Sequence, residues 1–212
     1  MYLFSRGVTL ATGRTRESIA WAIAQTERVN KITGLRVGLF MQVWSPEVGS
    51  VRFSTFVPDL ATLAAAGDKL NADDAFVSAT DEGAALIIGR ADDMLAQVVH
   101  GAPDPGREVE YVSAVRAVCA NGNVARGMEV GIELAKRAEK ITGVPSLFTT
   151  DVTGRYGGVG WVSGYDDVTA LETAQQALAS DGNWVSYVDN EVRGVFAEEP
   201  FLTTQTIYRR LA

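Results

Sequence analysis

The sequence contains one cysteine and one histidine among 212 residues. Because Cys119 stands alone, no disulfide can form within the chain, and residues 1–6 lack the basic and apolar parts of a secretory signal. A cytoplasmic protein is therefore expected. Because His100 stands alone, a multi-histidine metal site is excluded, and there is no second cysteine to complete a zinc site. We expect neither a metal nor a cofactor.

Long apolar runs and an excess of positive charge are also lacking. No apolar run approaches the ~20 residues that a transmembrane helix requires. The formal net charge is -7, and no cluster of lysine and arginine is interleaved with aromatic residues. Nucleic acids and anionic membranes are therefore poor candidate partners. A hydrophobic content of 47% is typical of a globular protein with an ample core.

What the sequence does contain is an internal repeat. The segment Lys-Ile-Thr-Gly at residues 31–34 returns at residues 140–143, an offset of 109 residues. The same offset pairs Tyr2 with Tyr111, and an offset of 108 pairs Asp59 with Asp167. The repeat therefore spans the chain, and we expect one repeat in residues 1–100, a linker rich in proline and glycine in residues 101–109, and a second repeat in residues 110–212.

Each half is expected to fold as strand, helix, strand, strand, helix, strand and a short terminal helix, which is a ferredoxin-like order within the α+β class. Gly34 is the predicted C-terminal cap of the first helix. The expected elements of the first half are strand 3–10, a helix from Thr15, hairpin 37–57, a helix from Asp59, strand 75–79 and a helix from Asp92 or Asp93 to Val99. Those of the second half are strand 111–120, helix 124–139, hairpin 145–165, helix 168–178, strand 184–188 and a helix following Pro200.

An antiparallel sheet with helices on one face needs a cover for its other face, and the equivalent face of the other half is the simplest partner. The hairpin Trp44-Ser45-Pro46-Glu47-Val48-Gly49, Phe53 and the helix-opening Asp59-Leu60 resemble the dimeric α/β-barrel superfamily, with the NIPSNAP-like and antibiotic-biosynthesis-monooxygenase-like branches nearest. The resemblance implies an intrachain pseudo-dimeric barrel. That superfamily includes cofactor-free oxygenases, haem enzymes, isomerases and proteins of unknown activity, so it leaves the function open.

The third strand of each half carries the main candidate site. In the second half, Trp161 and Tyr165 alternate with Gly160 and other glycines, which often mark close approach of a backbone or a ligand. Arg52 stands at the position that matches Gly160. If this face is the barrel interior, the first half presents a cation and the second half presents room for an acidic or enolate-like small molecule. The alternative is that the glycines admit helix packing and that Arg52 lies at an exposed edge.

Further polar and aromatic residues are candidates for the same interior. A buried charge there requires a partner or a ligand, and Arg6 or Arg116 could form a purely structural pair with Asp151. The three aspartate pairs at 73–74, 92–93 and 166–167 are expected to serve as caps and turns. The full candidate set for ligand binding is Arg52, Trp44, Gln42, Arg6, Arg116, Asp151, Trp161 and Tyr165, with Trp44, Trp161 and Tyr165 as apolar walls.

Two classes of function follow. The leading hypothesis is a small-molecule-binding protein that acts as a cofactor-independent oxygenase or isomerase on an aromatic or polyketide-like substrate, with Arg52 stabilising a developing oxyanion. The competing hypothesis is a non-catalytic interaction or scaffold protein of the NIPSNAP-like type. A third is haem binding through His100, although that residue is expected at an exposed helix end. Further homo-oligomerisation stays open.

Overall fold

The computed structural model describes residues 1–45, 49–104, 106–199 and 201–212. The chain divides into two compact units, unit 1 with Met1–Leu95 and Arg209–Ala212, and unit 2 with Ala96–Tyr208. Both combine α-helices with antiparallel strands, so the fold belongs to the α+β class. The residues outside the description include some expected turn and linker positions, namely Pro46, Glu47, Val48, Pro105 and Pro200.

Unit 1 contains four neighbouring strands in the order β4-β1-β3-β2. Strand β3 pairs antiparallel with both β1 and β2. Beside β2, the backbone N–H of Leu211 donates to the carbonyl of Leu39 at 2.8 Å. The elements are β1 (Tyr2–Leu10), the 3-10 turn η1 (Thr12–Arg14), α1 (Thr15–Thr33), β2 (Gly38–Val43), β3 (Ser50–Val57), α2 (Leu60–Asn71), α3 (Asp74–Glu82), the 3-10 turn η2 (Gly83–Leu86) and β4 (Ile87–His100).

Unit 2 has the equivalent strand order β8-β5-β7-β6, and residues 96–100 of β4 pair with β6. Strand β7 pairs antiparallel with β5 and β6. Strands β4 and β8 therefore each begin in one unit and end in the other. The elements are β5 (Tyr111–Val118), α4 (Val124–Thr142), β6 (Ser146–Asp151), β7 (Gly158–Tyr165), α5 (Val168–Ser180), α6 (Gly182–Glu191) and β8 (Thr204–Arg210).

The repeated Lys-Ile-Thr-Gly segment ends the long helix of each unit. Gly34 and Gly143 have φ angles of 75° and 70°, and their backbone N–H groups bond back to Asn30 and Glu139. Only glycine adopts this left-handed conformation without a steric penalty. The cap predicted at Gly34 is confirmed, and Gly143 forms the same kind of cap in unit 2.

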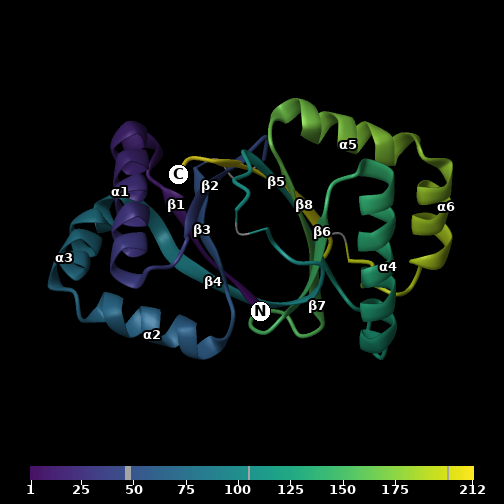
Figure 1. Ribbon diagram of the computed structural model, residues 1–212, viewed down its shortest axis with the longest axis horizontal. Helices are drawn as coiled ribbons and strands as arrows, with labels where there is room; N and C mark the ends of the chain where they lie inside the picture. Colours follow the sequence, from purple (N-terminus) through teal and green to yellow (C-terminus); the bar gives the residue numbers. More distant parts are fainter. Residues whose placement is uncertain (46–48, 105, 200) are drawn as a thin grey trace. The chain divides into compact units, whose positions relative to one another are not determined.

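The core of each unit lies between its sheet and its helices (Figure 1). In unit 1, Val8, Leu39 and Val51 pack with Ala22 of α1. In unit 2, Ala117, Phe148 and Val159 pack with Ala135 of α4. Because side chains alternate across a strand, the residues between these lie on the opposite face of each sheet. The candidate site lies on that helix-free face.

The elements after the second long helix of each unit differ from the sequence prediction. Residues 75–79 and 184–188, expected as strands, belong to helices α3 and α6. Their first turns are capped by Asp73 and Asp181, whose side chains accept the backbone N–H groups of Phe76 and Trp184 at 2.7 and 2.8 Å. A short apolar run does not distinguish strand from helix, so these caps decide.

The expected terminal helices are strands instead. Residues 92–99 belong to β4, and the segment after Pro200 forms β8. Both segments bond to neighbouring strands, which satisfies their backbone without a helix. Trp184 of α6 is half-buried and packs at the edge of a cluster that contains Val130 and Leu134. In the described part of the chain, no helix is long and apolar enough to cross a membrane.

Candidate functional site

Unit 1 has an arginine–aspartate pair on the helix-free face of its sheet. Arg52 on β3 stands opposite Gly7 on β1. Its Nη2 atom lies 3.0 Å from Oδ2 of Asp92 on β4. A Cβ atom at Gly7 would lie 2.5 Å from Asp92 Oδ1 and 3.1 Å from Arg52 Nη1. The pair therefore crosses β1 because residue 7 has no side chain.

Unit 2 has a corresponding pair on the same kind of face. Arg116 on β5 stands opposite Gly160 on β7, and its Nη2 atom pairs with Oδ2 of Asp151 at the end of β6. A Cβ atom at Gly158 would lie 2.1 Å from that carboxylate oxygen, and one at Gly160 would lie 3.9 Å from Arg116 Cγ. Glycines on β7 again leave the space that the ion pair occupies.

The two units place the arginine and the glycine on opposite members of the same strand pair. In the alignment of the repeats, Gly7 matches Arg116 and Arg52 matches Gly160. The arginine therefore stands on the third strand of unit 1 and on the first strand of unit 2, and in each case it faces a glycine. Neither arginine position is therefore shared by the two units.

The two pairs differ in their exposure to solvent. The Asp92 side chain is 63% exposed, whereas that of Asp151 is only 3% exposed. The arginines are similar to one another, at 27% for Arg52 and 35% for Arg116. Burial of a carboxylate is costly unless it is paired, so the pair of unit 2 is the more tightly constrained.

Thr149 and Arg116 lie near the position that a side chain of residue 160 would take. The side chain of Arg116 extends over Gly160, and Thr149 Oγ1 lies 3.1 Å from where its Cβ atom would be. The alternative in which the glycines admit a helix is wrong, because α4 packs on the other face, against Phe148. Of these glycines, Gly158 leaves the space that the Asp151 carboxylate occupies.

Gln42 and Trp44 lie near the end of β2. Gln42 shares the helix-free face with Arg52 by alternation with the core-facing Met41, and its Nε2 atom donates to Ser45 Oγ. Trp44 follows the strand, is 72% exposed and has a φ of 52°. Gln42 is therefore a neighbour of the Arg52 pair, and Trp44 is a surface residue.

Arg6 lies on the opposite face of β1 from Gly7 and does not reach Asp151. Its guanidinium makes two hydrogen bonds to Asp93, at 2.7 and 2.8 Å. The hydrogen bond from Arg6 holds the pKa of Asp93 below its usual value, and the same bond raises the pKa of Arg6. Of the two arginines considered as partners of Asp151, Arg116 is the one that pairs with it.

Trp161 and Tyr165 belong to the helix-covered face of β7. The Trp161 ring lies 5.4 Å from that of Phe148 and 5.5 Å from that of Phe196, and its Nε1 atom donates to the Gly131 carbonyl at 2.8 Å. Tyr165 is buried, and this burial raises the pKa of its phenol. These aromatic rings therefore pack in the core of unit 2 and do not form walls beside Arg116.

The only histidine lies at the end of strand β4, half-buried and opposite Phe148, and not at an exposed helix end. Within the described ranges, no group of three or more His, Cys, Asp or Glu side chains could hold a metal ion. Of the aspartate pairs, Asp73 and Asp167 cap helices as expected. Asp92 and Asp93 each pair with an arginine instead.

Two participants, Gly7 and Asp92, were missed in the sequence. The repeat alignment could have indicated Gly7, because it matches Arg116. Asp92 could not be found in this way, since it was assigned to a helix that does not form.

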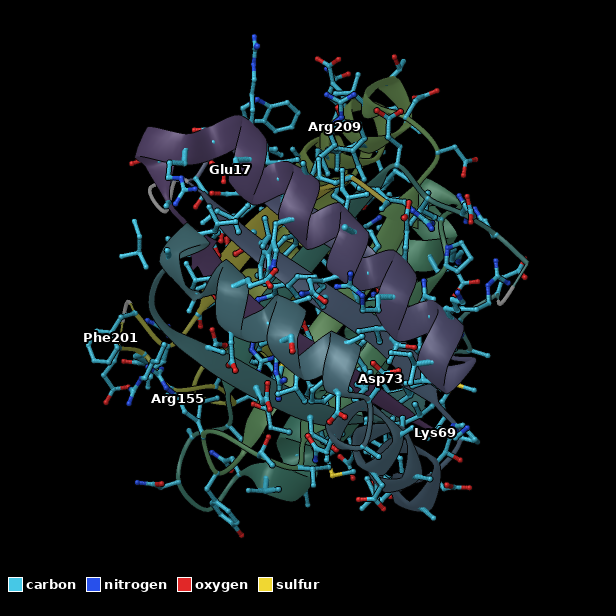
Figure 2. The ribbon with its side chains drawn as sticks, turned by 90° about the vertical axis from the view of Figure 1, so that its left-hand side faces the viewer. Glu17, Lys69, Asp73, Arg155, Phe201 and Arg209 are labelled. Atoms are coloured by element: carbon cyan, nitrogen blue, oxygen red, sulfur yellow. The ribbon has the colours of Figure 1, made fainter. Side chains whose placement is uncertain are left out.

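An exposed apolar surface lies elsewhere on unit 2. Tyr156 is 94% exposed and Phe201 is 68% exposed. Figure 2 shows Arg155 and Phe201 at the surface, and the Arg155 guanidinium lies 5.9 Å from the Phe201 ring centroid. Such a surface suits contact with another molecule.

No family model matches the sequence, and no curated protein matches it. Solved structures do resemble the chain. The "Putative monooxygenase" of Fusobacterium nucleatum has a TM-score of 0.72 over 100% of this chain and 92% of its own, at 8% identity. An anthrone oxidase-like protein has a TM-score of 0.66 over 100% and 91%, at 14% identity.

A NIPSNAP domain protein from Burkholderia xenovorans aligns with 49% of this chain and 100% of its own, at 19% identity and a TM-score of 0.42. A TM-score below 0.5 does not show a shared fold. At such identities the structural matches show the fold and not the activity. The chain therefore shares its fold with these solved structures, which agrees with the resemblance to dimeric α/β-barrel proteins that the sequence indicated.

Proposed function

We propose that this protein binds a small molecule with an acidic or enolate-like group, and that an arginine on the helix-free face of one unit, Arg52 in unit 1 or Arg116 in unit 2, contacts that group. One observation carries the proposal: each unit places an arginine–aspartate pair on the sheet face opposite its helices, over a glycine of a neighbouring strand. A packed apolar face would need no such charges, and replacing a buried ion pair by apolar residues is often neutral or stabilising. Their presence on both faces therefore favours a role in binding.

We also propose that the two units are copies of one ferredoxin-like repeat, residues 1–100 and 110–212, joined by a linker at 101–109 and closed as a pseudo-dimeric α/β barrel. The equivalent strand orders and the shared helix cap support this proposal.

The reaction class we propose is cofactor-independent oxygenation or isomerisation of an aromatic or polyketide-like substrate. Such chemistry passes through an anion on the substrate oxygen, and a fixed guanidinium stabilises that anion. The names of two structural neighbours, "Putative monooxygenase" and "anthrone oxidase-like", belong to those proteins and support this class only as a parallel.

The second candidate function is a non-catalytic interaction protein. The exposed Tyr156 and Phe201 favour it, since large exposed aromatic side chains are common at protein interfaces. In that case the arginine–aspartate pairs would be structural. The two functions differ in whether a small molecule accompanies the protein.

Native mass spectrometry of protein freshly isolated from its own host tests the proposal, followed by denaturing analysis of bound material. We expect an acidic or aromatic small molecule that is lost in Arg52→Met or Arg116→Met. The matched control is Arg126→Met, which removes an arginine from an exposed helical pair with Glu129. A chain that carries no small molecule and binds none from a panel of aromatic acids would support the interaction protein instead.

A further inference from the structure

The turn between β5 and α4 contains the only Asn-Gly pair of the sequence, at Asn121 and Gly122. Both residues are exposed to solvent. Gly122 has a φ angle of 83°, and no atom outside the adjacent residues lies within 4 Å of the place where its Cβ atom would stand. In the described part of the chain, neither the Asn121 side chain nor the Gly122 backbone N–H makes a hydrogen bond. Nothing around this turn therefore shields the side-chain amide or the next backbone nitrogen from water.

The other five asparagines lack this combination. Asn30 is held by two hydrogen bonds between its side-chain amide and the backbone of Val37, at 2.7 and 3.0 Å. Asn123 donates from its side chain to the Gly194 carbonyl at 3.0 Å. The remaining three lie in helices, namely Asn71 in α2 and Asn183 and Asn190 in α6. In all five, hydrogen bonds fix either the asparagine side chain or the backbone nitrogen that follows it.

We propose that Asn121 is a site of spontaneous deamidation in the folded protein. The deprotonated backbone nitrogen of Gly122 attacks the side-chain carbonyl carbon of Asn121, so that a new bond forms between them. The bond from that carbon to the amide nitrogen breaks, and the nitrogen leaves as ammonia, taking up the proton that the Gly122 nitrogen gave to solvent. Water then opens the resulting succinimide at either of its two carbonyl groups, which gives aspartate or isoaspartate. Water is the only co-reactant, and a glycine at residue 122 leaves the attacking nitrogen free of steric obstruction by a side chain.

The two products differ in their effect on the turn. The backbone N–H of Asn123 donates to the Ala120 carbonyl at 2.9 Å and closes the turn. Aspartate leaves the backbone unchanged and adds one negative charge to the formal -7, just before α4, whose first turn contains no acidic residue. A helix N-terminus favours such a charge. Isoaspartate lengthens the backbone by one carbon within the turn, so the closing hydrogen bond cannot keep its geometry. The turn therefore accommodates one product and is disrupted by the other.

The test is peptide mapping by mass spectrometry after the folded protein has been kept at a series of mildly alkaline pH values. We expect Asn121 to become an acid while the other five asparagines keep their amides. The rate should rise in proportion to the hydroxide concentration, because the attacking nitrogen must lose its proton. An isoaspartate-specific methyltransferase labels the isoaspartate product. The matched control is Asn121→Thr, which recreates the Thr12-Gly13 pair of unit 1 and should give no conversion.

A second control lies within unit 2 and separates the folded turn from the sequence. Asp181 and Gly182 are the only Asp-Gly pair and are open to the same ring closure. The Asp181 side chain, however, accepts the backbone N–H of Trp184 at 2.8 Å, so residue 181 should form isoaspartate only in urea. If Asn121 loses its amide in urea but keeps it in the folded protein, the turn protects the pair and the inference is overturned. Earlier conversion of another asparagine in the folded protein overturns it as well, and the map of the wild-type protein decides both points without the variant.

Discussion

Units 1 and 2 share an order of elements but fill the space between helix and sheet with different residues. In unit 1, Ala22 of α1 packs on Leu39 of β2. The equivalent positions in unit 2 are Gly131 of α4 and Phe148 of β6, and a Cβ atom at Gly131 would lie 2.2 Å from the Phe148 ring. In unit 2 the helix carries the smaller residue of the pair and the strand carries the larger one. Both units therefore have a helix–strand contact at these positions, made by different residues.

The arginine–aspartate pairs show the same kind of exchange on the other face of the sheet. Arg52 faces Gly7 in unit 1, and Arg116 faces Gly160 in unit 2. In both exchanges a large residue stands across from glycine, because two large residues cannot occupy one space. The comparison indicates that the two positions of each pair share one space, and this can be tested by restoring or breaking each pair.

The largest expected effect comes from Arg116→Met. This change leaves the buried Asp151 carboxylate without its cationic partner, and removal of one member of a buried pair costs about 3–5 kcal/mol. We expect the lower end of this range, about 3 kcal/mol, because Arg116 is itself partly exposed. Urea denaturation followed by circular dichroism measures the change in the free energy of unfolding.

Arg52→Met is the matched change in unit 1. Its partner Asp92 is largely exposed, so the loss should stay below about 1 kcal/mol. Equal losses in the two variants would show that burial does not distinguish the two pairs. A double variant with Met at position 116 and Leu at position 151 should recover most of the stability, since it removes the unpaired charge together with its former partner.

The second prediction concerns Gly131→Ala. The new methyl group would clash with the Phe148 ring, and overpacking costs typically about 1–3 kcal/mol, against a gain of about 1 kcal/mol in helix propensity. We expect a net loss of about 1 to 2 kcal/mol. Adding Phe148→Leu recreates the Ala–Leu combination of unit 1 and should recover part of that loss.

A double-mutant cycle measures this recovery as a coupling energy between positions 131 and 148. If the two substitutions changed the free energy of unfolding additively, positions 131 and 148 would not share one space. That result would contradict the proposed exchange of residue sizes between helix and strand. The change Gly67→Ala provides a control in unit 1, since a Cβ atom at that helical glycine meets no other atom within 4 Å. It should stabilise the protein slightly through helix propensity alone.

The part of the fold set by local chemistry could be predicted from the sequence. Gly34 and Gly143 end their helices as expected, because a left-handed cap depends on the residue itself. Residues 75–79 and 184–188 were assigned to strands because short apolar runs are ambiguous. In each case a preceding aspartate, Asp73 or Asp181, decides for a helix.

The candidate site could be predicted only in part. The alignment of the two halves indicated that Arg52 and Gly160 stand at matching positions of their strands. That Arg116 stands opposite Gly160 depends on the pairing register of β5 and β7, which the sequence pattern does not specify. Alternation along β7 also places Trp161 and Gly160 on opposite faces of the sheet. The prediction that Trp161 forms a wall of the same site therefore contradicted the strand pattern. The buried oxygen of Asp151 depends on tertiary packing and leaves no mark in the sequence.

The third prediction uses alkaline pH and Tyr165, which has Val57 as its counterpart in unit 1. Burial raises the pKa of the Tyr165 phenol in the folded protein. The unfolded chain therefore loses this proton first, near the ordinary value of about 10, and stability falls as the pH rises above it. Tyr165→Phe should lessen this fall, as measured by urea denaturation at a series of alkaline pH values. An unchanged pH dependence would contradict the assignment.

The smallest effect is expected at the exposed pair of Arg6 and Asp93, where unit 2 holds Val115 in place of the arginine. Arg6→Met should cost less than about 1 kcal/mol near neutral pH, since both side chains are exposed to solvent. The pKa of Asp93 is lowered in the folded state, so the contribution of the pair is present above the ordinary aspartate pKa and is lost as the pH falls through the lowered value. The stabilities of wild type and variant should therefore converge in acid, and NMR titration of the Asp93 carboxyl carbon should show its pKa returning toward the ordinary value in Arg6→Met. If the difference in stability grew in acid instead, Asp93 would not be the partner through which Arg6 acts. The ion pair would then contribute no more to stability at this position of unit 1 than the uncharged Val115 does in unit 2.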